Sequence, residues 1–188
     1  MQIIPLIEIN NRKIQNFERL EKLTEDNLLY VIDLDGIDKD ESNLDIYQKL
    51  SKKYQLWIDA APRKLGDVVD IFMAGATNIT LRKTFYPQVN LEKIREVTEN
   101  KIYENIEIYN QTVLFDDFFF EEVDGLINFY SKKEIEEDFK KYDVIKNFST
   151  KNKIHIYENN KKNIEYWNKF NPEGFLVDIS KYWEFKQI

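Results

Sequence analysis

The sequence has no cysteine, a single histidine and only five glycines in 188 residues. Without cysteine, disulfides and thiol chemistry are excluded, and a reducing cytoplasm is the expected compartment. One histidine and no cysteine leave a zinc site without its usual ligands, so we expect neither a metal nor a cofactor.

Long apolar runs and an excess of positive charge are also missing. No stretch of about 18 apolar residues occurs, so no membrane span is expected, and residues 1–6 read as a first strand rather than a signal peptide. The formal net charge of −7 gives the chain no electrostatic reason to bind nucleic acid. A hydrophobic content of 43% is enough for one core, so residues 1–188 are predicted to form a single domain.

Apolar strand patterns alternate with amphipathic helix patterns along the chain. Strands are predicted over residues 3–9, 28–34, 56–58, 78–81, 102–109, 126–130, 154–157 and 175–179. Eight strands that alternate with helices predict an α/β fold, a small (β/α)8 TIM barrel with trimmed loops. The alternative is an open doubly wound sheet, which requires one or two of these strands to be false.

Several helix ends are marked by capping residues. Ser42 is predicted to cap a helix over residues 44–54, and Asn90 to cap a helix that begins at residue 91. Gly75 is predicted to end a helix over residues 65–73. One helix is predicted over 135–145 and another over 164–170, whereas residues 113–120 fit either a strand extension or a short helix.

Carboxylates follow many of the predicted strands, most clearly where residues 30–36 run from apolar residues into Asp-Leu-Asp-Gly. The acids at strand ends are Glu8, Asp33, Asp35, Asp59, Glu158 and Asp178. The carboxyl ends of barrel strands share one face, where barrel enzymes keep their chemistry, so we expect these acids to ring that face. They fit a general acid and base or ligands of a divalent cation, and they equally fit helix caps.

Three cations stand near the same face. Arg63, Arg82 and Lys83 are candidates for binding an anion at the third and fourth strands, and salt bridges to the nearby acids are the alternative. His155 points opposite to the apolar residues beside it in its strand pattern, which favours a wall residue over a catalyst.

Aromatic residues gather in the second half of the chain. Phe115, Phe118, Phe119 and Phe120, with Tyr182, Trp183 and Phe185, are expected either to form an apolar surface for a partner or homo-oligomer or to seal the barrel.

The first half of the chain carries motifs of a known family. These are Ile-Pro-Leu-Ile-Glu-Ile at 4–9, Lys-Ile at 13–14, Val-Ile-Asp-Leu-Asp-Gly at 31–36 and Ile-Asp-Ala-Ala-Pro-Arg at 58–63. Over residues 3–84 the chain resembles the ribotide isomerase and cyclase-subunit family of histidine biosynthesis, and more closely the archaeal relatives of that family. Beyond residue 84 the resemblance is architectural only.

The resemblance implies acid/base catalysis by acids on the first and fifth strands. Glu8 occupies the first position, whereas the second has no match, and Glu107 and Asn110 are the nearest candidates. We take Glu8 and Asp33 as candidate catalytic residues. Candidate substrate-binding residues are Asp35, Asp59, Arg63, Arg82, Lys83 and Asp178.

The family's glycine-rich phosphate loops are not intact here. Backbone N–H groups approach a phosphate closely where no Cβ intervenes, and Asp59-Ala-Ala-Pro and Leu-Arg82-Lys83-Thr stand where glycines are expected. We therefore predict no activity on the histidine-pathway ribotide.

Two classes of function remain open. One is an isomerase or lyase that acts on a small anionic metabolite in archaeal cofactor metabolism. The other is a non-catalytic barrel that binds a ligand or another protein. Loss of glycine favours the second class, and the retained Glu8, Asp33 and Asp35 favour the first.

Overall fold

The computed structural model describes residues 1–25, 27–109, 112–113 and 122–186. Eight parallel strands form a closed barrel: β1 (Gln2–Asn10), β3 (Leu28–Asp33), β4 (Gln55–Asp59), β5 (Ala76–Leu81), β6 (Lys101–Asn105), β9 (Gly125–Asn128), β10 (Ile154–Tyr157) and β11 (Gly174–Asp178). Closure comes from β11 pairing with β1, where Leu6 lies opposite Asp178. The predicted (β/α)8 barrel is confirmed, and the open sheet is wrong.

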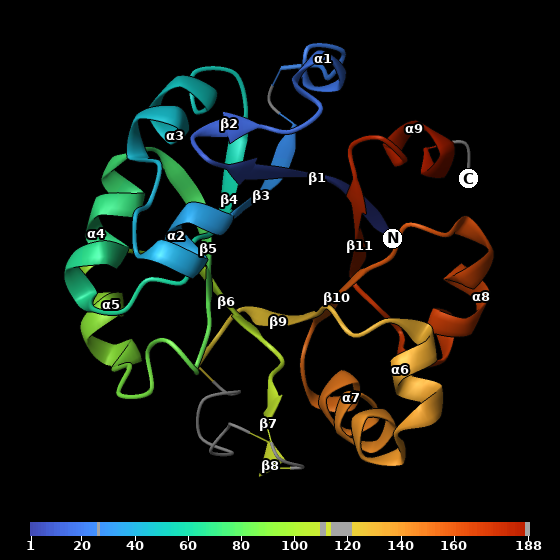
Figure 1. Ribbon diagram of the computed structural model, residues 1–188. Coiled ribbons are helices and arrows are strands. Elements are labelled where there is room, and N and C mark those ends of the chain that lie inside the picture. The colour runs from blue at the N-terminus through green and yellow to red at the C-terminus, as the bar shows by residue number, and fades with distance from the viewer. Residues whose placement is uncertain (26, 110–111, 114–121, 187–188) are drawn as a thin grey trace.

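Helices surround this ring of strands (Figure 1). They are α1 (Phe17–Leu20), α2 (Leu34–Lys39), α3 (Leu44–Leu50), α4 (Leu65–Met73), α5 (Leu91–Val97), α6 (Lys132–Glu137), α7 (Phe139–Lys151), α8 (Ile164–Trp167) and α9 (Tyr182–Phe185). Two 3-10 turns, η2 (Lys161–Asn163) and η3 (Asn168–Phe170), flank α8. In the part of the chain described above, no helix is both long and apolar enough to cross a membrane.

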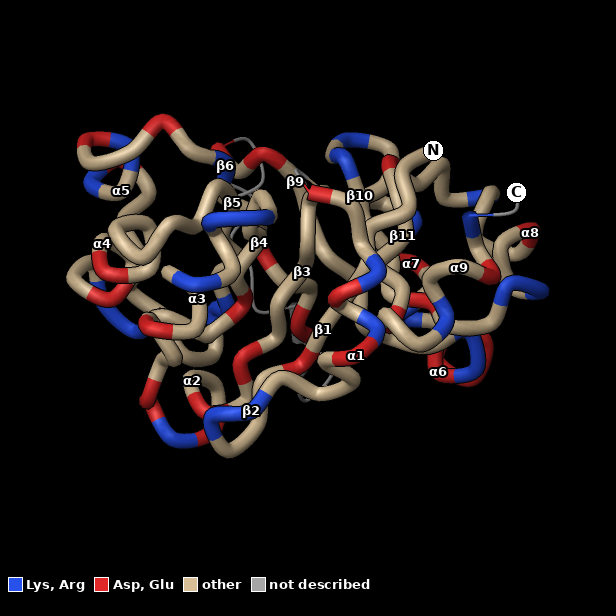
Figure 2. The backbone as a smooth tube through the Cα atoms, turned by 90° about the horizontal axis from the view of Figure 1, so that it is seen from above, with Lys and Arg blue, Asp and Glu red and all other residues tan. Residues whose placement is uncertain are grey.

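Two short antiparallel pairings extend beyond the barrel. β2 (Lys13–Ile14) folds back on the end of β1, and β7 (Ile108–Tyr109) pairs with β8 (Thr112–Val113) after β6. Seen from the side, β2 and α2 lie at one end of the barrel and the N-terminus at the other (Figure 2).

Strand alternation sorts the apolar side chains into an inner and an outer core. The inner core fills the barrel with Ile4, Leu6, Tyr30, Trp57, Tyr103, Ile127 and Leu176. The outer core lies between strands and helices, in one cluster around Val31, Ile58 and Ile79 and another around Ile156 and Val177. The same alternation decides which side chains face the interior at the carboxyl end.

Several predicted boundaries shift in the structure. The helix after Ser42 begins at Leu44 as predicted, but its N-cap is Asn43 rather than Ser42, and it ends at Leu50 rather than at residue 54. Asn90 caps α5 as predicted, because its side chain accepts from Lys93 N, and Gly75 follows α4 with a φ of 104°.

The helix predicted over 135–145 is two helices. Asp138 ends α6 with extended backbone, and its side chain accepts from the N–H groups of Lys140 and Lys141 to begin α7. An Asp that caps the following turn interrupts a helix, because its carboxylate satisfies the first N–H groups of a new one.

The predicted aromatic surface is only partly visible. Phe115, Phe118, Phe119 and Phe120 lie outside the described residues, as does all of 113–120 except Val113 in β8. Tyr182 and Phe185 are buried in the outer core, where they seal the barrel rather than form a surface. Assembly into a homo-oligomer stays a prediction.

Candidate functional site

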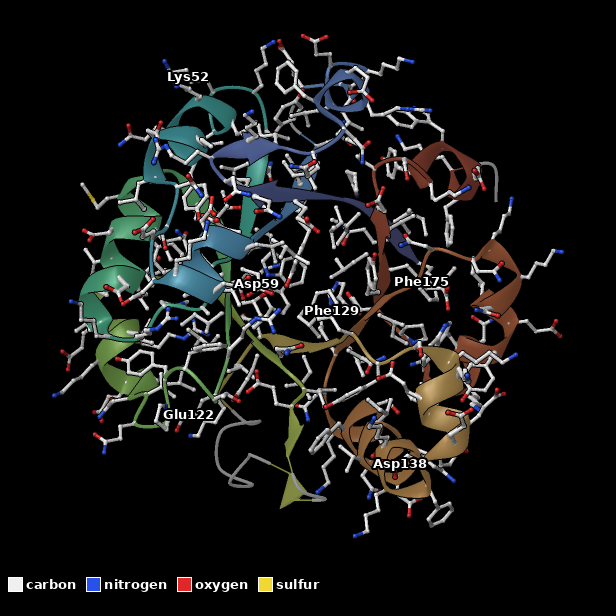
Figure 3. All side chains as sticks on the ribbon, viewed as in Figure 1. Lys52, Asp59, Glu122, Phe129, Asp138 and Phe175 are labelled. Atoms are coloured by element: carbon white, nitrogen blue, oxygen red, sulfur yellow. The ribbon has the colours of Figure 1, made fainter. Side chains whose placement is uncertain are left out.

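Beyond the inner core, each barrel strand has one more inward-facing side chain near its carboxyl end, and these side chains lie together in a ring. We call this ring the mouth. It consists of Glu8, Ile32, Asp59, Arg82, Asn105, Phe129, Tyr157 and Asp178. Asp59 and Phe129 lie inside the ring of strands in Figure 3. The predicted placement of Glu8, Asp33, Asp59 and Asp178 at one end of the sheet is confirmed, since the last three end their strands.

Asp33 shares this end but faces away from the mouth. β1 pairs with β3 so that Glu8 lies beside Ile32, whereas Asp33 lies beside Ile9 of the outer core. Glu8 and Asp33 are therefore on opposite faces of the sheet. The two residues taken from the sequence as candidate catalytic residues therefore do not face a common site.

The Asp33 carboxylate organises the loop that follows β3. It is fully buried and accepts hydrogen bonds from five donors: Asp35 N, Gly36 N, Asn43 N, Asn43 Nδ2 and Tyr47 Oη. Burial, and then the Asp33 charge, raises the pKa of Tyr47 and keeps it a donor. Asp33 acts as the N-cap of α2, and a catalytic role for it stays a prediction.

Asp35 is engaged in a similar way, outside the mouth. Its carboxylate accepts from Lys39 Nζ at 2.8 Å, from Asn43 Nδ2 at 3.0 Å and from the backbone N–H groups of Asn11 and Arg12. Asn11 and Arg12 both have left-handed backbone, with φ of 49° and 58°, which points two successive N–H groups at one anion. The hydrogen bond from Lys39, with the others, holds the pKa of Asp35 well below its usual range.

Asp59 and Arg82 form a pair within the mouth. Arg82 donates from Nε at 2.8 Å and from Nη2 at 2.7 Å to the two oxygens of the fully buried Asp59 carboxylate. Tyr30 Oη also donates to Asp59 at 3.0 Å, and the Arg82 guanidinium lies 5.6 Å from the centre of the Phe129 ring. The salt bridge proposed as the alternative for Arg82 is confirmed, and anion binding by this residue stays a prediction.

The remaining candidates hold the surroundings of the mouth together. Arg63 donates to the carbonyl oxygens of Gly36, Ile37 and Ala61 and pairs with Asp40, so it fixes the end of α2. Glu158 lies outside the ring and accepts from the side chains of Trp167 and Asn163.

Lys83 and His155 lie away from the mouth residues. Lys83 is half-buried, close enough to Glu104 on the outer face of β6 to favour the charged form of that acid. His155 packs inside the barrel, with its ring centre 5.0 Å from that of Trp57 and 5.6 Å from that of Tyr103. Burial lowers the pKa of His155 to about 4, so the ring is neutral at pH 7 and lines the barrel wall.

Glu8, Tyr157 and Asp178 form the part of the mouth where polar groups keep hydrogen-bonding capacity that the described residues do not use. Glu8 is half-buried, and its side chain makes no hydrogen bond or ion pair with any residue that the structure describes. Asn159 donates to Tyr157 Oη at 2.7 Å and accepts from Asp178 N at 2.8 Å, which fixes both residues. Asp178 accepts through Oδ1 from Ser180 N at 2.7 Å, and its Oδ2 has no hydrogen bond with the described residues.

Tyr157 is electrostatically coupled to both acids. Burial raises the pKa of its phenol, and the charges of Asp178 and Glu8 raise it further. Because Asn159 donates to the phenol oxygen, the Tyr157 proton remains available to another acceptor. The three residues therefore place two carboxylates beside a protonated phenol.

Asn105 is a mouth residue that the sequence did not reveal. β6 ends at Asn105, so this side chain, rather than Glu107 or Asn110, lies at the carboxyl end of the fifth barrel strand. It is 5% exposed, and its buried Oδ1 has no hydrogen-bond partner among the residues that the structure describes. Glu107 accepts from Thr84 N and Oγ1 beyond the strand end, and Asn110 lies outside the described residues.

The mouth offers hydrogen-bond acceptors, one phenol donor and aromatic walls. No cluster of three or more His, Asp or Glu suited to a metal ion occurs among residues 1–25, 27–109, 112–113 and 122–186. The arrangement suits hydrogen bonding to, and proton exchange with, a small molecule.

Comparison with known proteins identifies the fold. No protein-family model matches the chain, and no curated protein matches it in sequence. A monomeric dihydrodipicolinate synthase variant is 14% identical, with a TM-score of 0.54 over 95% of this chain and 68% of that one.

Two further solved structures cover this chain almost completely. The DHPS of Yersinia pestis is 12% identical, with a TM-score of 0.58 over 97% of this chain and 90% of that one. An HpcH/HpaI aldolase from Desulfitobacterium hafniense DCB-2 is 11% identical, with a TM-score of 0.58 over 98% and 89%. These likenesses show a TIM barrel, and none of the comparisons supports the resemblance to the histidine-biosynthesis isomerases.

Proposed function

We propose that the mouth is an active site of lyase or isomerase type, in which Glu8 moves a proton to or from a small polar metabolite. One observation carries this proposal. Among the described mouth residues, Glu8 is the carboxylate with neither oxygen engaged, whereas Asp59 is held by Arg82 and Tyr30. A general base must be accessible to the proton that it takes, and Glu8 alone keeps both oxygens available.

Tyr157 supplies the complementary donor. Glu8 would take a proton from a carbon next to a carbonyl, and the negative charge would develop on the carbonyl oxygen. The Tyr157 hydroxyl, held by Asn159, would donate a hydrogen bond to that oxygen. An enolate of this kind serves lyase and isomerase reactions alike. An aldolase and a dihydrodipicolinate synthase are among the proteins that share this fold.

A ligand-binding barrel without chemistry is the second candidate. Asn105 favours it, because this position opposite Glu8 holds an amide, which cannot serve as a second acid or base. The predicted anionic ligand also remains a proposal, although Arg82, its strongest support, is paired with Asp59.

Deuterium exchange separates the two candidates. The protein is incubated in D2O with a panel of small aldehydes, ketones and 2-oxo acids, and the loss of C–H signals is followed by proton NMR. We expect exchange by the native protein that falls at least about 100-fold in Glu8→Gln, the lower end of a general-base contribution.

The matched control is Glu96→Gln, the same change at an exposed position on α5. It should exchange like the native protein. Exchange that survives in Glu8→Gln would contradict the assigned role, and a thermal shift with panel compounds but no exchange would favour the non-catalytic barrel.

A further inference from the structure

Four polar atoms around the mouth have no hydrogen-bond partner among the described residues, and all four are acceptors. They are the two oxygens of Glu8, the second oxygen of Asp178 and Oδ1 of Asn105. The Asn105 oxygen is the most informative, because the side chain is only 5% exposed and water has little access to it. A buried polar atom without a partner costs about 1–3 kcal/mol, which a ligand that brings a donor would recover.

These acceptors lie on opposite walls. In the closed ring, β1 and β6 are four strands apart in either direction, so Glu8 and Asn105 face each other across the mouth. The interior of an eight-stranded barrel is only wide enough for side chains or one small molecule. A ligand that contacts both walls is therefore small and carries donors at two ends.

The charge of the mouth is negative. Its eight residues include the acids Glu8, Asp59 and Asp178 but only one cation, Arg82. The bidentate pair between Arg82 and Asp59 cancels one acid, so among the eight mouth residues no cation is left to compensate Glu8 and Asp178. Phe129 and Tyr157, with ring centres 5.4 Å apart, add aromatic faces of the kind that attract cations.

We propose that the mouth binds a small aliphatic amine in its protonated form, with an ammonium group at Glu8 and Asp178 and a second N–H or O–H donor at Asn105. This inference rests on the proposed function in that it uses the same mouth, and it names the chemical class of the ligand. It also reverses the charge of the ligand expected from the sequence, since Arg82 is already neutralised.

Three four-carbon compounds test the charge directly. Binding of 1,4-diaminobutane, 1,4-butanediol and succinate is measured by calorimetry and thermal shift at one ionic strength, with MgCl2 as a fourth arm. We expect saturable binding of the diamine alone. Tighter binding of succinate, a response to Mg²⁺ that matches or displaces the diamine, or no diamine binding up to about 10 mM would overturn the proposal.

Variants at both walls test the geometry. Glu8→Gln should weaken diamine binding by about tenfold or more, as the loss of a charge-assisted hydrogen bond implies, whereas Glu96→Gln should not change it. Asn105→Asp should tighten diamine binding, because it adds a negative charge at the second donor. If that variant folds poorly, Asn105→Leu provides the test in the other direction, with weaker binding expected. Equal affinity in all four variants would overturn the proposal.

Failure of this inference and failure of the proposed function give different results. Diamine binding without deuterium exchange on any carbonyl compound would leave the amine site standing and remove the chemistry. Glu8-dependent exchange without diamine binding would support the proposed chemistry and remove the amine site.

Discussion

The carboxyl end of the barrel has two sides that use carboxylates differently. At the ends of β3 and β4 and in the first turn of α2, Asp33, Asp59 and Asp35 each accept several hydrogen bonds from donors within the chain. Along β11 and β1, Glu8 makes none with the described residues and Asp178 uses a single oxygen. The acids whose oxygens are hydrogen-bonded within the chain stabilise the loops, whereas our proposal assigns the other two to a ligand. Position at a strand end does not by itself indicate function.

The largest loss of stability should come from removing Asp59, the mouth acid whose oxygens are hydrogen-bonded within the chain. Asp59→Leu leaves the Arg82 guanidinium largely buried without its partner, since only 17% of that side chain is exposed. We expect a loss of about 3–5 kcal/mol in the free energy of unfolding, measured by urea denaturation.

Two further variants check that this loss comes from the orphaned charge. The double variant Asp59→Leu with Arg82→Met should recover most of the loss. Asp45→Ala, which removes an exposed partner of Arg12, should cost less than about 1 kcal/mol. Equal losses in the double and single variants would contradict the explanation.

Two asparagines provide a matched comparison between the sides. Asn43 is buried and donates to both Asp33 and Asp35, whereas Asn159 is half-buried and connects Tyr157 with Asp178. Asn43→Ala should cost about 3 kcal/mol and Asn159→Ala about 1 kcal/mol by thermal or urea unfolding. A larger loss for Asn159→Ala would reverse the assignment of the two sides.

Glu104 is a buried acid that should make stability depend on pH. Its two oxygens have no hydrogen bonds with the described residues, and burial, only partly offset by the charge of Lys83, raises its pKa to about 8 from an ordinary value of 4.5. The folded state thus holds a proton that the unfolded state releases, so the Glu104 contribution is complete below pH 4.5 and is lost as the pH rises to about 8.

The change in stability above pH 6.5 comes mainly from this group. His155, with a pKa lowered to about 4 from 6.5, has the opposite sign, and only about 0.4 kcal/mol of its contribution is still to change above pH 6.5. From pH 6.5 to 8.5 we expect the free energy of unfolding to fall by about 2 kcal/mol. The variant Glu104→Gln should show no such fall, and a fall that persists in it would assign the effect to another group.

Much of the fold could be predicted because the strand signal is strong. Seven of the eight barrel strands lie within two residues of their predicted bounds. The fifth was predicted to run to residue 109, because alternation of isoleucine with polar residues continues from β6 into the β7 hairpin. Because the pattern continues past Asn105, the sequence did not show that the strand ends at this residue.

The faces of the acids could not be predicted. Residues 28–33 are apolar on both sides, since a strand of a closed barrel is buried toward the interior and toward the helices. Nothing in this pattern shows that Tyr30 points inward and Asp33 outward. The roles of the acids follow from packing between distant elements, such as Asn43 and Tyr47 around Asp33.

The comparison of Asp33→Asn with Glu8→Gln tests the central claim most directly, because each variant removes one negative charge at the same end of the barrel. Unfolding of both variants and of the native protein is followed in urea at pH 7. We predict that Asp33→Asn loses several kcal/mol, since it disturbs five hydrogen bonds, whereas Glu8→Gln changes stability by less than about 0.5 kcal/mol. A loss in Glu8→Gln as large as that in Asp33→Asn would show that Glu8 also holds the fold together. It would contradict the division between acids that are hydrogen-bonded within the chain and acids that are not.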